Sequence, residues 1–206
     1  MNLPNGLTLV RIFLVPLLVA VLSTRPMTHP QMLIAIAIFL AASLTDLLDG
    51  YFARKRGQIT TLGVLLDPIA DKLLISAAVI SLVEIGAVPA WMAAIIIGRE
   101  FAVSGLRSIA SSQGFTIEAS ELGKIKMVAQ VVALTLLMLG AQYPESPFPV
   151  LGKVSLYVVV LFALWSAVGY FSNFWTRIDD RFKAQERRRM ILLKRRQRRH
   201  GHVPTP

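Results

Sequence analysis

Cysteine is absent from this 206-residue sequence, and histidine occurs only three times. The lack of cysteine excludes disulfide bonds and metal sites built from thiolates. Charged side chains are also scarce, at 17% of the residues, and half of the 22 Lys and Arg residues fall between Arg177 and Arg199. Apolar residues make up 54%, whereas soluble domains contain about 45–50%. This excess predicts a protein embedded in a lipid bilayer.

Six apolar segments follow one another along the chain, at residues 7–22, 32–53, 62–85, 90–109, 125–139 and 151–174. A helix that crosses a bilayer needs about 20 apolar residues, and the shorter segments reach that length with their flanks. Backbone groups find no water inside a bilayer, and these runs are too long and continuous for barrel strands. The first segment lacks the basic start and cleavage site of a signal peptide. The sequence therefore predicts an all-α integral membrane protein with six transmembrane helices.

Basic residues are distributed unevenly among the predicted loops. The first, third and fifth loops contain a single basic residue, Arg25. The second loop, the fourth loop with its borders and the segment after the sixth helix hold most of the others, including Arg54, Lys55, Arg56, Arg107, Lys124 and Lys126. Short cytoplasmic loops carry an excess of Lys and Arg. This distribution predicts that both termini are cytoplasmic.

Four aspartates lie inside the predicted membrane helices. Asp46 and Asp49 are near the cytoplasmic end of the second helix, and Asp67 and Asp71 are near the cytoplasmic start of the third. Each ionised group at the bilayer centre costs at least about 2.5–3.5 kcal/mol, and four carboxylates in one layer repel one another. Divalent cations remove both problems, since Mg²⁺ and Mn²⁺ prefer carboxylate ligands and two ions can share a bridging carboxylate. The pattern predicts a metal site.

The aspartates share helix faces with small residues. At 100° per residue, one broad stripe of the second helix contains Asp46, Asp49, Gly50, Ala53 and Arg54, and one stripe of the third contains Gly63, Asp67 and Asp71. A short loop makes the two helices antiparallel neighbours, so the stripes can face each other. The small residues leave space for a bulky ligand, and Arg54 can bind a phosphate. Two alternatives are that the aspartates pair with cations or line a water-filled cavity, as in a divalent-cation channel or carrier.

The spacing of these residues resembles the signature of a known family. Residues 46–71 contain the pattern D-x2-D-G-x2-A-R-x8-G-x3-D-x3-D, and all eight fixed positions match the signature of the CDP-alcohol phosphotransferase family. The resemblance implies that family's six-helix fold and two divalent ions, Mg²⁺ or Mn²⁺, held by Asp46, Asp49, Asp67 and Asp71. It also implies that Asp71 is the general base and that the CDP moiety is bound by Asp46, Gly50, Ala53, Arg54 and Gly63.

Three further segments resemble bacterial phosphatidylglycerophosphate synthases, and with the signature the resemblance covers about residues 1–175. They are residues 1–11 (MNLPNGLTLVR), 98–107 (GREFAVSGLR) and 123–130 (GKIKMVAQ). Such enzymes convert CDP-diacylglycerol and glycerol 3-phosphate to phosphatidylglycerophosphate and CMP. The resemblance implies a homodimer in the bacterial cytoplasmic membrane with its active site facing the cytoplasm. Other acceptors, such as inositol phosphate, serine or phosphocholine-type alcohols, remain an alternative.

Four basic residues are candidates for binding the phosphate of the acceptor: Arg99, Arg107, Lys124 and Lys126. Topology alone also places basic residues at cytoplasmic helix ends. Arg99 lies deeper in its helix than that rule explains and needs a partner. Arg can hold a phosphate bidentately, whereas Lys cannot, so we rank Arg99 and Arg107 above the two lysines.

The predicted domain organisation has two parts, a transmembrane domain at residues 1–176 and a basic cytoplasmic tail at residues 177–206. A cationic segment beside a membrane helix gains about 1 kcal/mol per basic residue from anionic lipids. We therefore predict that the tail binds anionic lipid rather than nucleic acid. The sequence leaves open whether the tail is helical.

Overall fold

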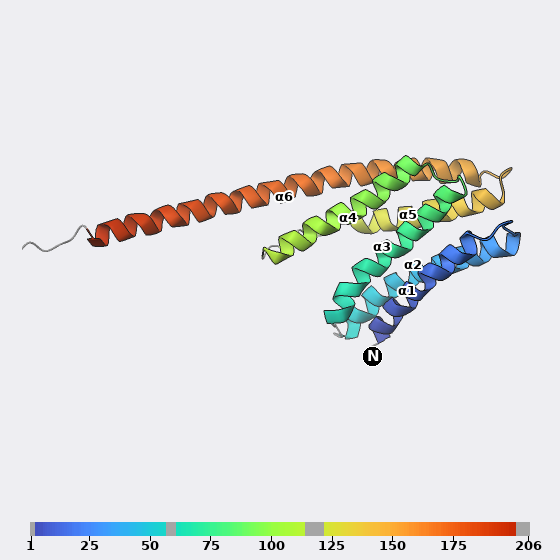
Figure 1. Ribbon diagram of the computed structural model, residues 1–206, viewed down its shortest axis with the longest axis horizontal. Helices are drawn as coiled ribbons and strands as arrows, with labels where there is room; N and C mark the ends of the chain where they lie inside the picture. Colours follow the sequence, from blue (N-terminus) through green and yellow to red (C-terminus); the bar gives the residue numbers. More distant parts are fainter. Residues whose placement is uncertain (1–2, 57–60, 114–121, 201–206) are drawn as a thin grey trace, which may run out of the picture. The chain divides into compact units, whose positions relative to one another are not determined.

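The computed structural model describes residues 3–56, 61–113 and 122–200, and within these ranges it contains helices and no strand (Figure 1). The six helices are α1 (Leu3–Leu22), α2 (His29–Arg56), α3 (Thr61–Glu84), α4 (Ala90–Ser112), α5 (Leu122–Gln142) and α6 (Phe148–His200). The six predicted apolar segments coincide with these helices, which extend beyond most of the segment ends. The prediction of an all-helical protein is therefore confirmed for the described residues.

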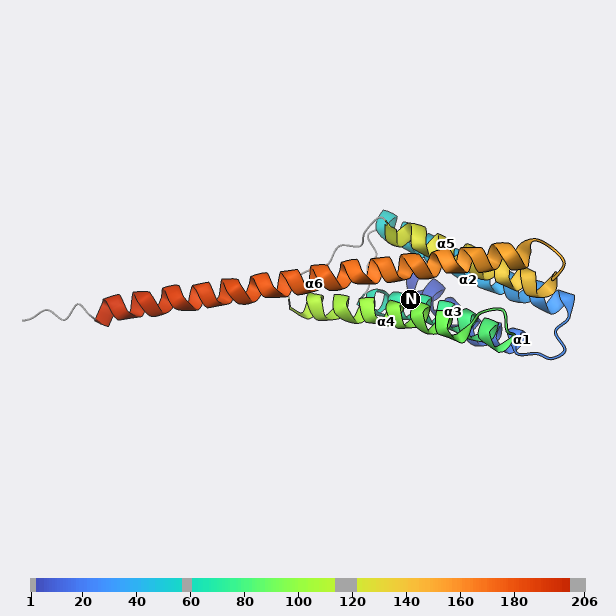
Figure 2. The ribbon, with the colours of Figure 1, turned by 90° about the horizontal axis from the view of Figure 1, so that it is seen from above.

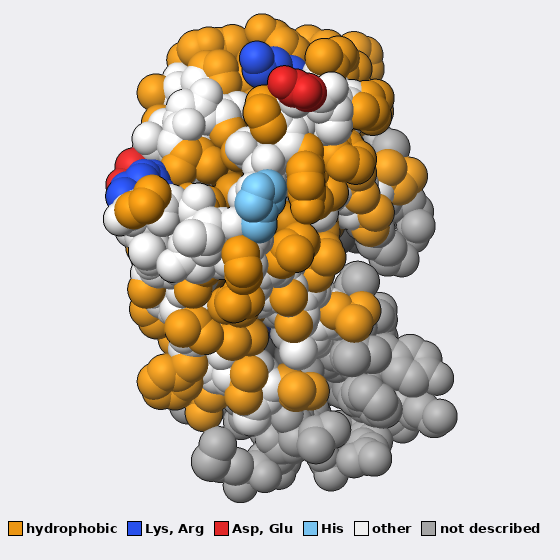
Figure 3. All heavy atoms as spheres, turned by 90° about the vertical axis from the view of Figure 1, so that its right-hand side faces the viewer, with side chains coloured by type: hydrophobic (Ala, Val, Ile, Leu, Met, Phe, Trp, Pro, Cys, Tyr) orange, Lys and Arg blue, Asp and Glu red, His pale blue; other side chains and the backbone are white. Residues whose placement is uncertain are grey.

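The surface of the protein is suited to lipid. By length and composition, two segments of the described chain can cross a membrane, Ile125–Gln142 in α5 and Phe148–Asp179 in α6, and shorter apolar helices occupy Gly6–Leu22 and His29–Thr45. Large apolar side chains such as Phe13 and Trp165 are 73% and 78% exposed, and apolar side chains predominate on the described part of the face drawn in Figure 3. Extensive exposed apolar surface of this kind marks contact with a membrane or a partner. The apolar helices indicate a membrane protein, while six spans and their orientation stay predictions.

The chain divides into two units, of which the first comprises Met1–Ala102 and Ala119–Trp165. Within it α1 packs against α2 and α3, and α5 packs against the same two helices (Figures 1 and 2). The buried core of this unit also includes residues from the first part of α4 and the first part of α6. Its largest fully buried side chains include Leu18, Phe39, Leu74, Met92, Leu134 and Leu156. This core positions the helices that carry the signature aspartates.

Two glycines allow α5 and α6 to approach closely where they join. A Cβ atom at residue 140 would lie only 2.8 Å from the Cα of Pro149, and one at residue 152 would lie 3.0 Å from the side chain of Leu137. Both distances are shorter than ordinary van der Waals contact. Pro149 falls in the first turn of α6, where a missing backbone N–H is tolerated. The sequence thus favours a tight connection between these helices.

The second unit comprises Val103–Glu118 and Ser166–Pro206. Ala110 of α4 and Phe174 of α6 form its buried cluster, with Leu106 and Ile178 packed against them. The sequence left open whether the basic C-terminal segment is helical. In the structure α6 continues as a helix to His200. The predicted boundary at residues 176 and 177 falls inside this helix, and the division into a membrane domain and a tail stays a prediction.

Candidate active site

The helices that carry the four aspartates are in contact. Asp46 and Asp49 lie on α2, Asp67 and Asp71 lie on α3, and these helices pack together. Asp46 is ten residues before the end of α2 at Arg56, and Asp71 is ten residues after the start of α3 at Thr61. With a rise of about 1.5 Å per residue, both lie about 15 Å from the connection between the helices. The backbone positions of Asp46 and Asp71 therefore lie at a similar depth in the two helices.

Most of the signature side chains lie outside the described part of the structure. Their helical backbone is described, but their side chains are not; they are Asp46, Asp49, Gly50, Ala53, Arg54, Gly63 and Asp67. The predicted metal ligands among them and the predicted contacts to CDP stay predictions. The described side chains contain no group of three potential ligands that could hold a metal, and Asp71 is the one signature aspartate among them.

A buried arginine of α1 contacts α2 one turn before the signature. Arg11 of α1 is fully buried, and its Nε donates a hydrogen bond to the backbone carbonyl of Ala42 at 3.2 Å. Ala42 is four residues before Asp46 on α2, so the contact ties α1 to the helix that begins the motif. The sequence analysis included Arg11 in a resembling segment but assigned it no role, although a positive charge within an apolar segment is a visible signal.

Asp71 brings two parts of the predicted site together. Its side chain is half-buried on α3, and it lies close enough to the ammonium group of Lys126 on α5 for the two charges to interact. Helices α3 and α5 pack together. Asp71 is the predicted general base, and Lys126 is a predicted ligand of the acceptor phosphate. Two predicted site residues from different helices thus belong to one region of the first unit, while their roles stay predictions.

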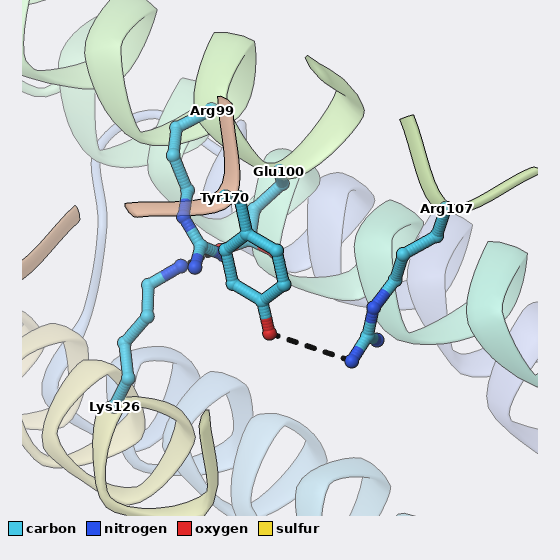
Figure 4. Close-up of polar contacts among 5 residues, drawn as sticks. All are labelled: Arg99, Glu100, Arg107, Lys126 and Tyr170. Atoms are coloured by element: carbon cyan, nitrogen blue, oxygen red, sulfur yellow. Dashed lines mark hydrogen bonds and ion pairs between the residues drawn. The ribbon is translucent and has the colours of Figure 1, made fainter. Parts of the chain in front are cut away.

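Lys126 and Arg99 share one carboxylate. Nη1 of Arg99 donates a hydrogen bond to Oε1 of Glu100 at 3.1 Å, and Nζ of Lys126 donates to the same oxygen (Figure 4). The side chains of Arg99 and Lys126 are only 10% and 7% exposed, and that of Glu100 is 20% exposed. Buried cations need such a partner, because removing a charge from water is costly. This ion-pair cluster connects α4 to α5.

Sequence reasoning did not assign Glu100 to the site. On a helical wheel it points about 100° away from Arg99, but wheel angles describe Cα–Cβ directions and not the ends of long side chains. A usable signal exists, since Glu100 is the single acidic residue of α4. A membrane helix that contains buried basic residues needs a counter-ion for them.

Arg107 has a different partner within the second unit. Its Nη2 donates a hydrogen bond to the hydroxyl of Tyr170 at 3.4 Å, and its guanidinium carbon lies 5.5 Å from the centroid of that ring (Figure 4). Its Nε atom is buried and makes no hydrogen bond among the described residues. Sequence reasoning missed Tyr170. The described contacts of Arg99 lie in the first unit. The binding of one acceptor phosphate by both Arg99 and Arg107 stays a prediction.

Two residues flank Lys126 on α5. The side chain of Lys124 lies outside the described residues, so its predicted role is not addressed by the structure. Gln130, one turn beyond Lys126, is 4% exposed, and its Nε2 donor has no partner among the described groups. A buried amide without a partner is costly and often marks a place where water or a ligand binds.

Comparison with known proteins decides the family. Residues 1–165 match the family model of CDP-alcohol phosphatidyltransferases. The chain belongs to this family. The match includes α1 to α5 and the first part of α6, together with every predicted site residue, whereas the basic end of α6 lies beyond it. The resemblance recognised in the aspartate spacing is confirmed at this level.

Several members of the CDP-alcohol phosphatidyltransferase family are similar along most of this chain. The Bacillus subtilis protein named CDP-diacylglycerol–glycerol-3-phosphate 3-phosphatidyltransferase is 41% identical, over 84% of this chain and 95% of its own length. A Rickettsia felis protein of the same name is 33% identical, over 82% and 93%. A rice protein named cardiolipin synthase (CMP-forming) is 37% identical, over 85% of this chain and 58% of its own length.

Proposed function

We propose that this chain transfers the phosphatidyl group of CDP-diacylglycerol to glycerol 3-phosphate, forming phosphatidylglycerophosphate and CMP. The observation that carries this assignment is the 41% identity to the Bacillus subtilis enzyme of that name, which extends over nearly the whole of that protein. The packing of α5, which carries Lys126, against α3, which carries Asp71, supports it, since a cation for the acceptor phosphate belongs close to the group that activates the acceptor hydroxyl. The activity places the protein in the synthesis of anionic phospholipids.

The donor set of the signature fits divalent metal ions. Carboxylates are the ligands that Mg²⁺ and Mn²⁺ prefer, and the four aspartates lie on two helices that pack together. We propose that Asp46, Asp49, Asp67 and Asp71 hold two such ions. When bound, the ions supply positive charge that stabilises the diphosphate and the departing CMP.

The side chains of the protein then bind and orient the substrates. Gly50, Ala53 and Gly63 leave room for the CDP moiety, Arg54 pairs with its phosphate, and Asp46 belongs to the same subsite. Asp71 takes the proton of the acceptor hydroxyl while the hydroxyl oxygen attacks the β-phosphorus of CDP-diacylglycerol. The bond between that phosphorus and the bridging oxygen breaks, and CMP leaves with the oxygen. No covalent enzyme intermediate is needed.

Cations on α4 and α5 bind the acceptor. Glycerol 3-phosphate carries about two negative charges near neutral pH, and the aspartate cluster repels it unless positive charge lies nearby. Arg99 and Lys126 together bring two positive charges, of which Glu100 balances one. Arg107 and Lys124 are the further candidates that the sequence offers for the acceptor phosphate. An acceptor without a phosphate gains little from these groups.

We further propose six transmembrane spans in the bacterial cytoplasmic membrane, with both termini and the active site on the cytoplasmic side. Glycerol 3-phosphate is water-soluble and reaches a site on that side directly. The excess of Lys and Arg in the second and fourth loops supports this orientation. A homodimer, implied by the resemblance alone, stays a prediction.

The basic end of α6 is proposed to bind anionic lipid. It continues as a helix to His200 beyond the family match, and it contains half of the basic residues of the chain. Each basic residue near an anionic membrane surface contributes about 1 kcal/mol. Truncation after Asp180 should weaken binding of the purified protein to vesicles containing phosphatidylglycerol, and unchanged binding would contradict the proposal.

An assay of CMP release across acceptors tests the main proposal. Purified enzyme with CDP-diacylglycerol should release CMP rapidly with glycerol 3-phosphate and slowly with inositol phosphate or serine. Phosphatidylglycerol belongs in the panel because one relative is named cardiolipin synthase. A preference for any acceptor other than glycerol 3-phosphate would overturn the proposed substrate while leaving the family assignment intact. Metal flux without CMP release would favour the channel or carrier.

A further inference from the structure

The carboxylate of Glu100 joins two cations that come from different helices. Oε1 accepts hydrogen bonds from Nη1 of Arg99 on α4 and from Nζ of Lys126 on α5. All three side chains are largely buried, at 10%, 20% and 7% exposed for Arg99, Glu100 and Lys126. Lys126 also interacts electrostatically with Asp71. The lysine that Glu100 contacts thus lies on a helix that packs against the helix of the predicted general base.

We propose that Glu100 is a positioning residue for the acceptor phosphate, which it serves by holding Arg99 and Lys126 in the acceptor subsite. The proposal rests on the proposed function, in which a phosphate-bearing alcohol is the acceptor. In this role Glu100 acts through the two cations and not on the reacting atoms. Its carboxylate sets the positions and orientations of the guanidinium group of Arg99 and the ammonium group of Lys126.

The position of Lys126 along its helix explains why a positioning residue is needed. Lys126 lies four residues after the start of α5 at Leu122, at the end of the helix that faces the cytoplasm in the proposed topology. A lysine at such a place extends its flexible side chain toward the water and lipid headgroups. In this structure the ammonium group instead lies in a buried contact with α4. The bond to Glu100 accounts for this inward orientation.

Positioning and simple neutralisation predict opposite effects when the negative charge is removed. If Glu100 serves only to balance charge, Glu100→Gln leaves two cations uncompensated, and the dianionic acceptor binds more tightly. If Glu100 positions the cations, the same change releases Lys126 toward the membrane surface, and the acceptor binds more weakly. The direction of the change in KM for glycerol 3-phosphate therefore separates the two roles.

The experiment uses purified full-length enzyme in lipid–detergent micelles and measures CMP release while each substrate is varied in turn. We expect Glu100→Gln to raise the KM for glycerol 3-phosphate about tenfold or more, since charge-assisted bonds are lost. The KM for CDP-diacylglycerol should stay within about twofold, and kcat should change less than the acceptor KM. Glu100→Asp retains a carboxylate on a shorter side chain and should give an intermediate KM.

A double-mutant cycle tests whether Glu100 acts through Lys126. Lys126→Gln should raise the acceptor KM by itself. Adding Glu100→Gln should then raise the KM by a smaller factor than it does in the wild-type enzyme, because the contact with Lys126 is already broken and only the contact with Arg99 is newly lost. Glu84→Gln is a matched control. Glu84 is exposed and lies 3.8 Å from Arg25 in an ion pair at the far end of α3, so this variant should retain both KM values.

Each outcome has a defined meaning. A lower acceptor KM for Glu100→Gln, equal changes in both KM values, or fully multiplicative effects in the double variant would overturn the proposal. If Glu100→Gln does not yield folded protein, Glu100→Asp and Lys126→Gln test the proposal instead. An unchanged acceptor KM in both variants would overturn the proposal. Failure of the proposed function is recognised separately, because the wild-type enzyme would then release CMP without a preference for glycerol 3-phosphate.

Discussion

The hydroxyl of Tyr170 accepts a hydrogen bond from Nη2 of Arg107 at 3.4 Å, while the guanidinium carbon of Arg107 lies 5.5 Å from the centroid of the Tyr170 ring. One side chain of α6 thus offers Arg107 both a hydroxyl and an aromatic face. Contacts of this kind restrict a guanidinium group to a small range of orientations and are each worth about 0.5–2 kcal/mol. We therefore predict that Tyr170 orients Arg107.

Substitution of Tyr170 tests this orientation. Tyr170→Phe keeps the ring and removes the hydroxyl, so we expect a rise of about two- to fivefold in the KM for glycerol 3-phosphate. Tyr170→Ala removes both contacts and should raise that KM about tenfold. The measurement is steady-state CMP release with the acceptor varied. Tyr157→Phe, at an exposed tyrosine of the same helix, is the control, and an unchanged KM in Tyr170→Ala would show that Arg107 does not depend on Tyr170.

The two arginines of α4 are expected to bind the acceptor and not the lipid donor. Arg99→Ala and Arg107→Ala should each raise the KM for glycerol 3-phosphate by roughly ten- to a hundredfold, because a charge-assisted bond in a buried site is worth about 1.5–3 kcal/mol. The KM for CDP-diacylglycerol should move much less. Kinetics with each substrate varied separately provide the measurement. Similar shifts in both constants would indicate that the arginines support the fold.

Asp71→Asn should abolish most turnover. The amide keeps the size and one oxygen of the carboxylate but cannot accept a proton as a carboxylate does, and loss of a general base costs about 10²–10⁴ in rate. CDP-diacylglycerol should still bind, as measured with a labelled donor. Asp179→Asn, an exposed aspartate of α6, is the matched control. Near-normal turnover in Asp71→Asn would show that a group other than Asp71 takes the proton of the acceptor hydroxyl.

Activity should require a divalent metal. Four carboxylates without cysteine or histidine partners form a donor set for hard cations. Chelator should remove activity from the purified enzyme, and Mg²⁺ or Mn²⁺ should restore it. Full turnover in excess chelator would contradict the two-metal proposal. Calorimetric titration of Mg²⁺ into the wild-type protein and into Asp67→Asn would show whether the aspartates hold the ion.

The proposed orientation can be measured by labelling single cysteines. The natural sequence has no cysteine, so Gly57→Cys and Ser146→Cys each introduce a unique thiol. In intact cells an impermeant thiol reagent should label residue 146 from outside, while residue 57 should react only after the membrane is permeabilised. The opposite pattern would overturn the argument from loop charges.

Most of the fold could be predicted because its cause is local. Each apolar run of about 20 residues forms a helix by satisfying its own backbone hydrogen bonds, whatever its neighbours are. The six predicted segments therefore coincide with α1 to α6. The helical end of α6 was not predicted, since basic residues with scattered apolar ones are compatible with helix or with disorder.

The sequence by itself determined the family and the helices that carry the aspartates. Asp46, Asp49, Asp67 and Asp71 share two helix faces through a spacing of three or four residues, and this periodicity belongs to the chain alone. Tertiary structure decided the partners of the basic residues. The sharing of Glu100 by Arg99 and Lys126, and the contact of Arg107 with Tyr170, depend on which helices are neighbours and how each is rotated about its axis. The packing of side chains between helices sets that rotation, and residues far apart in the sequence contribute to it together.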